Sequence, residues 1–205
     1  MIVVMEGPSA AGKTTWCGAH CPELLAENAS ENLNAPGLYG DPCEVAHFWV
    51  EFNAKQWRAA LQIEQEKGIA VCDGDPFHLY FAWSLWKTGA LDRNLFDAEL
   101  PLYRRVIDEG RIGFADLALW REAPLEELRH RAKSDSTRQR RRHELYLTMI
   151  PWMRAWFAAR EQVLPRSVRD WSEQFRIEEV RGALTSSHRY DVEALDRMMQ
   201  VLNDR

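Results

Sequence analysis

The chain has 205 residues, of which 46% are hydrophobic and 28% are charged, and its formal net charge is −5. This length can bury one sizeable core, so we expect a single domain over residues 1–205. The negative charge argues against a general attraction to nucleic acid or to an anionic membrane, and no apolar run approaches the ~18 residues of a membrane span. We therefore expect neither nucleic acid nor a membrane as a partner.

The cysteines and the N-terminal apolar run bear on the cellular setting. Four cysteines in a chain of this length do not suggest a disulfide framework. A reducing, cytoplasmic setting is therefore expected. The apolar run at the N-terminus is too short for a signal peptide, which agrees with that expectation.

Apolar residues in the first half of the chain alternate between the short runs typical of buried strands and the spacing typical of helices. In chain order, the pattern predicts a strand over 2–5, a helix over 14–27, a loop over 28–42, a strand over 44–50, a helix over 52–67 and a strand over 69–73. Gly68 is expected to end the second of these helices.

The second half continues the alternation. The predicted elements are helices over 76–88 and 95–109, a strand over 114–120, helices over 124–133 and 138–163, a strand over 167–171 and a helix over 191–202. Pro151 should kink or restart the long helix that contains it. Strands that alternate with helices indicate an α/β fold with a parallel sheet covered on both faces.

The sequence directly after the first strand carries a phosphate-binding motif. Residues 7–14 match the pattern G-x-x-x-x-G-K-[ST]. Gly7 and Gly12 let the backbone turn where a Cβ would clash, so that successive N–H groups can hold a β-phosphate. Lys13 is expected to reach the β- and γ-phosphates, and the Thr14 hydroxyl to bind the magnesium ion they share. The predicted nucleotide-binding residues are Gly7, Ser9, Ala10, Ala11, Gly12, Lys13, Thr14 and Thr15.

An acid at the end of another predicted strand is the main catalytic candidate. Asp73 ends the apolar run 69–72, and the carboxyl ends of parallel strands meet at the edge from which the phosphate loop emerges. Its carboxylate could hold magnesium or accept the proton of an attacking hydroxyl. Asp75 could take either role, or cap the helix that begins near Pro76. Asp116 begins its strand, so a structural role is expected for it.

A basic segment over 129–142 flanks a polar break between two predicted helices. Its charged residues are Arg129, Arg131, Lys133, Arg138, Arg140, Arg141 and Arg142 against Asp135. Such a run is either a solvated helical face or a lid that stabilises charge on a transferred phosphoryl group. In the second case Arg138 and Arg142, which share one helical face, are the better candidates. Nucleic-acid binding is disfavoured because no aromatic residues interleave with the basic ones.

The predicted helix after Asp73 is rich in aromatic residues. Its candidates for contact with a flat acceptor ring are Phe77, His78, Tyr80, Phe81 and Trp83. The same helical spacing is what ordinary core packing produces. We expect most of these side chains to pack in the core and one or two to line a pocket.

The order of these motifs resembles the P-loop nucleoside and nucleotide kinase superfamily. The matching pieces are GPSAAGKTT over 7–15, VCD over 71–73, ADLALW over 115–120 and APLEELRHR over 123–131, followed by the basic segment where such kinases carry lid arginines. The resemblance implies a three-layer α/β/α P-loop NTPase fold with a mainly parallel sheet of about five strands. It also implies ATP and Mg²⁺ as cofactors.

The chain departs from that superfamily at two positions and leaves its proton acceptor open. Ala10 stands where these kinases often have Gly, a change that small-molecule kinases related to chloramphenicol phosphotransferase tolerate. Gly74 stands where an Arg commonly follows the third-strand acid and contacts phosphate or substrate. Glu44 and Glu51, near the predicted strand over 44–50, are alternative proton acceptors to Asp73 and Asp75.

The sequence thus predicts an ATP-dependent phosphotransferase with a small-molecule acceptor, a nucleoside or nucleotide ahead of an antibiotic or metabolite. A nucleotide-binding sensor with little turnover is the alternative from another class, although the chain lacks an N-K-x-D guanine signature. A kinase for polynucleotide ends would need basic surface beyond the segment 129–142. The pattern leaves both a monomer and a homodimer open.

Overall fold

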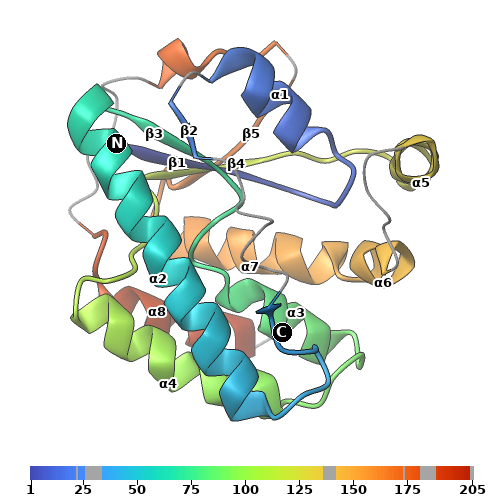
Figure 1. Ribbon diagram of the computed structural model, residues 1–205, viewed down its shortest axis with the longest axis vertical. Coiled ribbons are helices and arrows are strands. Elements are labelled where there is room, and N and C mark those ends of the chain that lie inside the picture. The colour runs from blue at the N-terminus through green and yellow to red at the C-terminus, as the bar shows by residue number, and fades with distance from the viewer. Residues whose placement is uncertain (22, 26–33, 136–141, 173, 181–187, 204–205) are drawn as a thin grey trace.

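The computed structural model describes residues 1–21, 23–25, 34–135, 142–172, 174–180 and 188–203 (Figure 1). Within these residues, five parallel strands form one sheet in the order β2-β3-β1-β4-β5. The strands are β1 (Ile2–Glu6), β2 (Leu24–Leu25), β3 (Ala70–Asp73), β4 (Leu117–Trp120) and β5 (Val168–Asp170). The predicted α/β class, the parallel pairing and the number of strands are confirmed.

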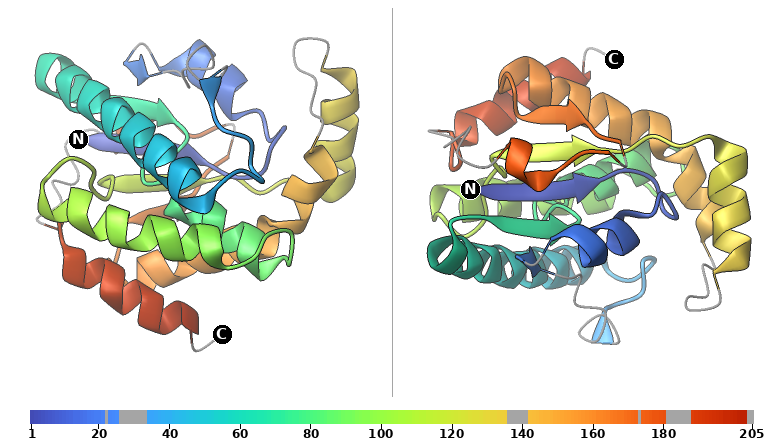
Figure 2. Two further views of the ribbon diagram at one scale, coloured as in Figure 1. Left: turned by 60° about the horizontal axis from the view of Figure 1, so that its bottom comes forward. Right: turned by 90° about the horizontal axis from the view of Figure 1, so that it is seen from above.

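Helices cover both faces of this sheet, as predicted for a three-layer fold. They are α1 (Lys13–His20), α2 (Pro42–Lys67), α3 (Leu79–Lys87), α4 (Asn94–Asp108), α5 (Leu125–Ser134), α6 (His143–Thr148), α7 (Ile150–Val163) and α8 (Val192–Asn203), with a 3₁₀ turn η2 at Ile177–Glu179. Figures 1 and 2 show α1 and η2 over one face and α2, α3, α4, α7 and α8 against the other. The helices α5 and α6 stand at the end of the sheet toward which the strands point.

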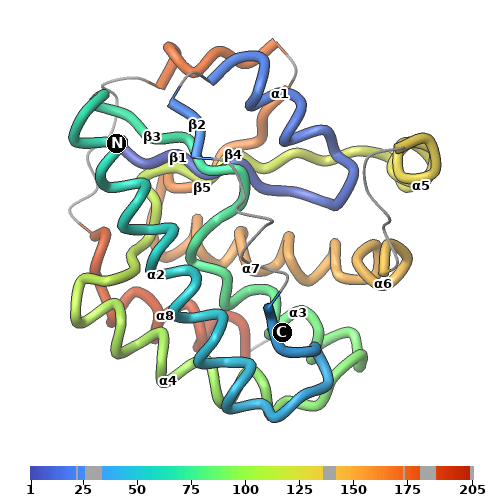
Figure 3. The backbone as a smooth tube through the Cα atoms, viewed as in Figure 1, coloured from blue at the N-terminus to red at the C-terminus, as the bar shows by residue number. Residues whose placement is uncertain are grey.

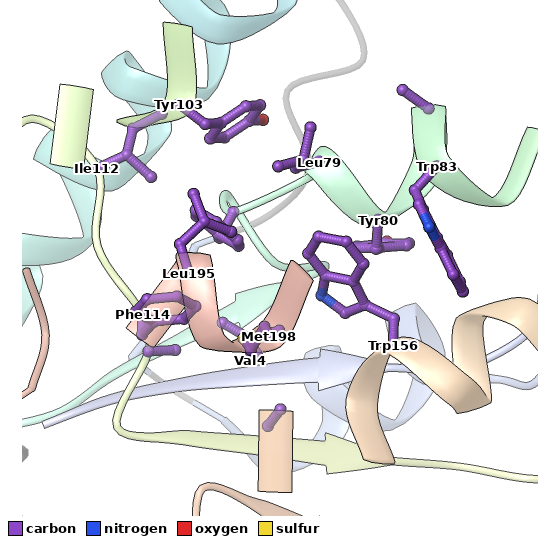
Figure 4. Packing of buried hydrophobic residues seen from close by; sticks show 14 of the residues in the cluster. Val4, Leu79, Tyr80, Trp83, Tyr103, Ile112, Phe114, Trp156, Leu195 and Met198 are labelled. Carbon is purple, nitrogen blue, oxygen red and sulfur yellow. The ribbon is translucent and has the colours of Figure 1, made fainter. Parts of the chain in front are cut away.

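The central strand β1 supplies side chains to both cores, because successive residues of a strand point to opposite faces. Ile2 and Val4 belong to the larger cluster, with α2, α3, α4, α7 and α8, whereas Val3 and Met5 belong to the smaller one beside α1. All four are fully buried. Figure 4 shows the larger cluster, where Val4 lies beside Met198 of α8, with Phe114 on one side and Trp156 on the other. Because both faces of β1 are buried, residues 2–5 are all apolar, without the polar residues that alternate in a half-exposed strand.

One predicted strand is wrong. Residues 44–50 belong to the long helix α2 and form no strand. Asp41 caps this helix, because its Oδ1 accepts hydrogen bonds from the N–H groups of Cys43 and Glu44, both at 3.0 Å. Pro42 is favourable in the first turn, where its missing N–H costs nothing. In Figure 3 the tube leads from α2 directly into β3. The remaining strand of the sheet, β2, is formed by Leu24–Leu25, before α2 in the chain.

Several predicted boundaries also shift. The first helix ends at His20 instead of residue 27, since Cys21 is extended and Leu24–Leu25 form β2. Within the predicted loop over 28–42, residues 34–41 precede α2, and 28–33 lie outside the described residues. The predicted helix over 76–88 begins at Leu79.

The predicted long helix over 138–163 is divided. Residues 138–141 lie outside the described residues, α6 ends at Thr148, and α7 restarts at Ile150 with Pro151 in its first turn. This confirms the expected effect of the proline. In the part of the chain that the structure describes, no helix is both long and apolar enough to span a membrane.

Two buried carboxylates hold the sheet to distant segments. Asp116 Oδ2 accepts a hydrogen bond from the backbone N–H of Ile2 at 2.7 Å and pairs with Arg189 at 2.6 Å, so its expected structural role fits the geometry. Asp75 pairs with Arg160 of α7 at 3.0 Å, with both side chains at most 2% exposed. The second guanidinium nitrogen of Arg160 donates to the Ala115 carbonyl at 2.6 Å.

Replacing Arg160 should test how far the fold depends on its buried ion pair. Arg160→Met leaves the Asp75 carboxylate buried without its cation, so we expect the free energy of unfolding to fall by about 3–5 kcal/mol in urea titrations. Adding Asp75→Asn should recover part of this loss. The control is Arg154→Met on the same helix, whose ion pair with Asp170 is largely solvated and should cost at most about 1 kcal/mol. Equal losses for the two single variants would contradict the assignment.

Candidate active site

The phosphate loop follows β1 and leads into α1. Gly7 has φ +136° and lies so close to β4 that a Cβ at this position would be 2.4 Å from the Arg121 carbonyl oxygen. Gly12 has φ +88°, also a region that favours glycine. Ala10 adopts φ +69°, so this alanine holds the left-handed conformation where related loops often carry glycine. The backbone path required by the motif is therefore present despite that departure.

Lys13 lies at the start of α1 with its ammonium folded over the loop. Its Nζ donates hydrogen bonds to the carbonyl oxygens of Gly7 at 2.7 Å and Pro8 at 3.1 Å. The loop and the ammonium together form a concave, positively polarised surface at a helix N-terminus. This arrangement fits the phosphates of a nucleotide.

The two predicted magnesium ligands lie in contact. Thr14 Oγ1 donates a hydrogen bond to Asp73 Oδ2 at 2.6 Å, although the residues are 59 positions apart. The register of the sheet brings them together, because Met5, the residue before the end of β1, pairs with Asp73 at the end of β3. A hydroxyl and a carboxylate oxygen are hard ligands of the kind that Mg²⁺ takes beside phosphate oxygens. The residues present therefore fit the metal that the motif implies.

Glu6 is a site residue that the sequence reasoning missed. It ends β1, is 1% exposed, and lines the cavity described below. Its Oε1 accepts hydrogen bonds from the N–H of Asp75 at 2.6 Å and the hydroxyl of Tyr80 at 3.1 Å. Burial raises the pKa of Glu6 to about 7, with Lys13 acting in the opposite direction. The signal was available, since Glu6 is an acid at the end of a buried strand, as Asp73 is.

The other candidate proton acceptors are placed by the structure as follows. Asp75 lines the cavity, yet its Oδ1 accepts from the Phe77 N–H at 2.8 Å and its Oδ2 is held by Arg160. It does not cap a helix, because α3 begins at Leu79 and no side chain among the described residues caps its first turn. Glu44 and Glu51 are exposed on α2, outside the residues that line the cavity. Arg111 binds both carboxylate oxygens of Glu51 at 2.7 and 2.6 Å. Neither glutamate is placed to activate an acceptor.

Arginines from the segment after β4 approach the phosphate loop. Arg131 of α5 donates from Nη1 to the Ala11 carbonyl at 3.0 Å, and Arg121 directly follows β4 with its guanidinium over the Trp171 ring. The sequence reasoning did not single out Arg121, and it favoured other arginines than Arg131. Arg142 lines the cavity and lies over the Tyr39 ring, with 5.6 Å from its guanidinium carbon to the ring centroid.

The rest of the basic segment is divided. Arg138, Arg140 and Arg141 lie outside the described residues. Arg129 pairs with Glu126 at 2.9 Å and with Glu144 at 3.1 Å, and it does not line the cavity. Among its described residues, the segment thus has a solvated ion-pair face and side chains that reach the cavity.

A single cavity of about 1470 Å³ joins the phosphate loop to a pocket between the helices. This volume exceeds the ~300–1000 Å³ typical of a site for one small ligand, so two ligands can be accommodated. The end away from the loop is lined by Trp49, Phe52, Asn53, Gln56, His78, Tyr80, Phe81, Leu95, Glu99, Tyr146, Met149 and Met153. We call these residues the acceptor pocket, after the role proposed for them below.

The aromatic residues predicted to meet a flat ring fall into two groups. His78, Tyr80 and Phe81 line the cavity, and the rings of His78 and Phe81 stack with centroids 4.9 Å apart. Phe77 and Trp83 are 1% exposed in the core, where Trp83 packs near Trp156 (Figure 4). Three of the five residues therefore line the cavity, more than the one or two expected, and two pack in the core.

Closing the space beside Gly7 should disrupt the loop. In Gly7→Ala the new Cβ meets the backbone of Arg121, so we expect the free energy of unfolding to fall by roughly 1–3 kcal/mol and calorimetry to register no MgATP binding. The control is Gly18→Ala in α1, where a Cβ meets nothing within 4 Å. It should raise stability by about 0.5–1 kcal/mol, because alanine is the better helix former. MgATP binding by Gly7→Ala would contradict the loop geometry.

The buried carboxyl of Glu6 should make stability depend on pH. Its pKa is about 7 in the folded chain against an ordinary value of 4.5, so the folded state retains a proton between these pH values that the unfolded state releases. The free energy of unfolding should therefore fall as the pH rises from 4.5 to 7. Glu6→Gln keeps the shape and does not titrate. In urea unfolding at pH 5 and pH 7.5, we expect a smaller decrease for this variant than for the wild type, and an equal decrease would refute the assignment.

Comparisons with known proteins bear on the fold. No protein-family model and no curated protein matches the chain. Among solved structures, deoxyadenosine kinase from M. mycoides with bound dATP superposes with a TM-score of 0.62 at 12% identity, over 98% of this chain and 99% of that one.

Two further structures of the same enzyme give similar results. The complex with the products dCMP and a flexible dCDP gives a TM-score of 0.60 at 13% identity, over 100% of this chain and 98% of that one. The complex with dCTP gives 0.58 at 14% identity, over 100% of both chains. This chain has the fold of a P-loop nucleoside kinase over its whole length.

Proposed function

We propose that this protein is an ATP-dependent phosphotransferase that moves the γ-phosphoryl group of ATP to a hydroxyl of a nucleoside or nucleotide. The observation that carries the proposal is the single cavity that joins the phosphate loop to the acceptor pocket. A nucleotide sensor needs only the first of these two regions. The fold shared with a deoxyadenosine kinase that binds dATP and dCTP supports the same assignment.

The donor end of the cavity would hold ATP and Mg²⁺. The N–H groups of the loop, from Gly7 to Thr15, and the ammonium of Lys13 would bind the phosphates. Thr14 and Asp73 would hold the metal ion, which when bound neutralises charge on the phosphate oxygens. Arg121 and Arg131 are close enough to the loop to stabilise negative charge on the group in transfer.

The lid assignment over residues 129–142 extends this proposal. Arg142 would close the cavity from the α6 side, and Arg138 would join it from the same segment. Closing arginines exclude water, which otherwise competes with the acceptor for the phosphoryl group. We treat residues 1–205 as one functional unit, with this segment as its lid.

Asp73 is proposed to act on the acceptor as well as on the metal. It lies at the edge between the phosphate loop and the acceptor pocket, and its bond to Thr14 supports the magnesium role. In transfer, the acceptor oxygen bonds to the γ-phosphorus while the bond from that phosphorus to the ADP oxygen breaks. The proton of the acceptor hydroxyl passes to the Asp73 carboxylate.

The acceptor pocket suits a flat, partly polar ring. Its aromatic walls offer stacking surfaces, and Asn53 and Gln56 offer amide groups beside them. A nucleobase meets both requirements better than a saturated metabolite does.

The cysteines among the described residues are free thiols, which fits the proposed cytoplasmic setting.

Transfer of labelled phosphate tests the proposal directly. Purified protein with Mg²⁺ and γ-labelled ATP should phosphorylate at least one member of a panel of nucleosides and nucleotides. Lys13→Ala should lower the rate by roughly 10²–10³-fold or more, and Asp73→Asn should lower the rate more than it weakens ATP binding. Lys55→Ala, at an exposed position on α2, is the control and should match the wild type.

The outcomes separate the competing functions. ATP binding without transfer to any nucleoside, nucleotide, antibiotic or metabolite would favour the sensor. Transfer only to an antibiotic or metabolite would retain the kinase and overturn the acceptor class. Full activity of Asp73→Asn would show that another group accepts the proton.

A further inference from the structure

A carboxyl group lies buried in the acceptor pocket without a partner. Glu99 is on α4, is 5% exposed, and lines the cavity together with Leu95, one helical turn earlier. No hydrogen bond or ion pair joins its side chain to another residue in the part of the chain that the structure describes. A buried polar group left without a partner costs about 1–3 kcal/mol. Such a group in a binding cavity is therefore a candidate contact for a ligand.

Hydrogen bonds of Tyr103 join α4, the helix that carries Glu99, to two other elements that line the pocket. Tyr103 follows one turn later on α4, and its hydroxyl accepts hydrogen bonds from Asn53 Nδ2 at 2.9 Å and from the His78 N–H at 3.2 Å. Asn53 comes from α2 and His78 precedes α3, and both line the cavity. Glu99 thus projects from a framework fixed by α2, α4 and the start of α3.

The electrostatic surroundings favour an uncharged Glu99. Burial raises the pKa of Glu99 well above its usual value, and no cation compensates. Burial also lowers the pKa of His78 to about 4, so this ring is neutral near pH 7. Tyr103, one turn further along α4, has its pKa raised, first by burial and then by Glu99. The helices α2, α3 and α4 contribute no Lys or Arg to the cavity lining.

We propose that Glu99, in its protonated form, is a specificity-determining residue that binds the edge of the acceptor ring through a pair of hydrogen bonds. This inference rests on the proposed function, since it names a contact of the acceptor in the same cavity. A protonated carboxyl offers one O–H donor beside one carbonyl acceptor. It therefore matches a ring edge with one donor next to one acceptor, such as an amino group beside a ring nitrogen in adenine or cytosine, or the N–H beside a carbonyl in uracil.

The same geometry disfavours another class of acceptor. A planar group whose edge presents two adjacent donors and no acceptor, such as an amidine or a guanidine, would match an ionised carboxylate instead. A site built to hydrogen-bond a substrate discriminates strongly when one of its polar groups is left unpaired. We therefore expect acceptors of that kind to bind more weakly than nucleosides, whose bases present a donor next to an acceptor.

Two substitutions of similar size distinguish a protonated Glu99 from an ionised one. In Glu99→Gln the amide keeps one donor and one acceptor, so nucleoside dissociation constants from calorimetry should stay within about threefold of the wild type. In Glu99→Leu both hydrogen bonds are lost, and binding of the preferred nucleosides should weaken by roughly tenfold to a hundredfold. The control is Asp97→Asn, exposed on the same helix, which should leave nucleoside binding unaltered.

A purely structural role would give different results. Glu99→Leu removes an unpartnered buried carboxyl, so a structural role alone would make the variant more stable without weakening nucleoside binding. An equal loss of binding in Glu99→Gln and Glu99→Leu would show that Glu99 acts as an anion. Either result would overturn the inference, as would a wild type that binds no nucleoside.

The measurements also separate this inference from the proposed function. If the wild type transfers phosphate and Glu99→Leu retains its KM for the nucleoside, only the inference fails. If nucleoside binding depends on Glu99 as expected but no phosphate is transferred, the proposed function fails, and Glu99 is a contact of a bound nucleoside that is not an acceptor. For active protein, the loss in Glu99→Leu should appear mainly in KM for the nucleoside, with the affinity for MgATP retained.

Discussion

The carboxyl of Glu6 is the contact on which the arrangement of the site depends. It ends the central strand β1, and through it the backbone of Asp75 and the hydroxyl of Tyr80 are fixed against the start of the phosphate loop. The segment after β3 is thereby held beside the loop, so that Asp73 reaches Thr14 across the top of the sheet. One buried acid thus connects the phosphate end of the cavity, through Tyr80, to the wall of the acceptor pocket.

The parallel register determines which residues this edge can present. Asp73 stands beside Met5, and Trp120 stands beside Glu6, so β1, β3 and β4 end together and deliver Gly7, Gly74 and Arg121 to the same edge. Gly74 has φ +97°, and its N–H donates to the Met5 carbonyl at 3.2 Å. A position with this backbone suits glycine better than arginine. Positive charge comes instead from Arg121 and Arg131, on the opposite side of the loop.

Local patterns in the sequence were sufficient for most of the fold and for the phosphate loop. The alternation of short apolar runs with amphipathic helices predicted a parallel sheet, because the strands of such a sheet are buried on both faces. Residues 44–50 were misassigned because an apolar run of this length fits a strand and a buried helix equally well. The cap at Asp41 was the local signal that distinguishes them.

The rest of the site could not be predicted from local patterns, because it depends on contacts between distant parts of the chain. The sequence gives no indication that Arg131 reaches the Ala11 carbonyl, 120 residues away, or that Glu99 faces a cavity and not solvent. Glu99 and Glu51 look alike in sequence, since both are acids on amphipathic helices. Only the tertiary structure shows that Arg111 binds one in solvent while the other is buried without a partner.

The two ends of the cavity differ in charge, and this difference bears on the acceptor proposed above. Lys13, Arg121 and Arg131 lie at the phosphate end, whereas α2, α3 and α4 line the other end with aromatic, amide and buried acidic groups. A charged ring would lose its hydration in that pocket with no opposite charge to compensate. An acceptor with an uncharged planar part, joined to a hydroxyl that reaches toward the phosphate end, avoids this cost. Nucleosides have this distribution of charge, and polycationic antibiotics do not.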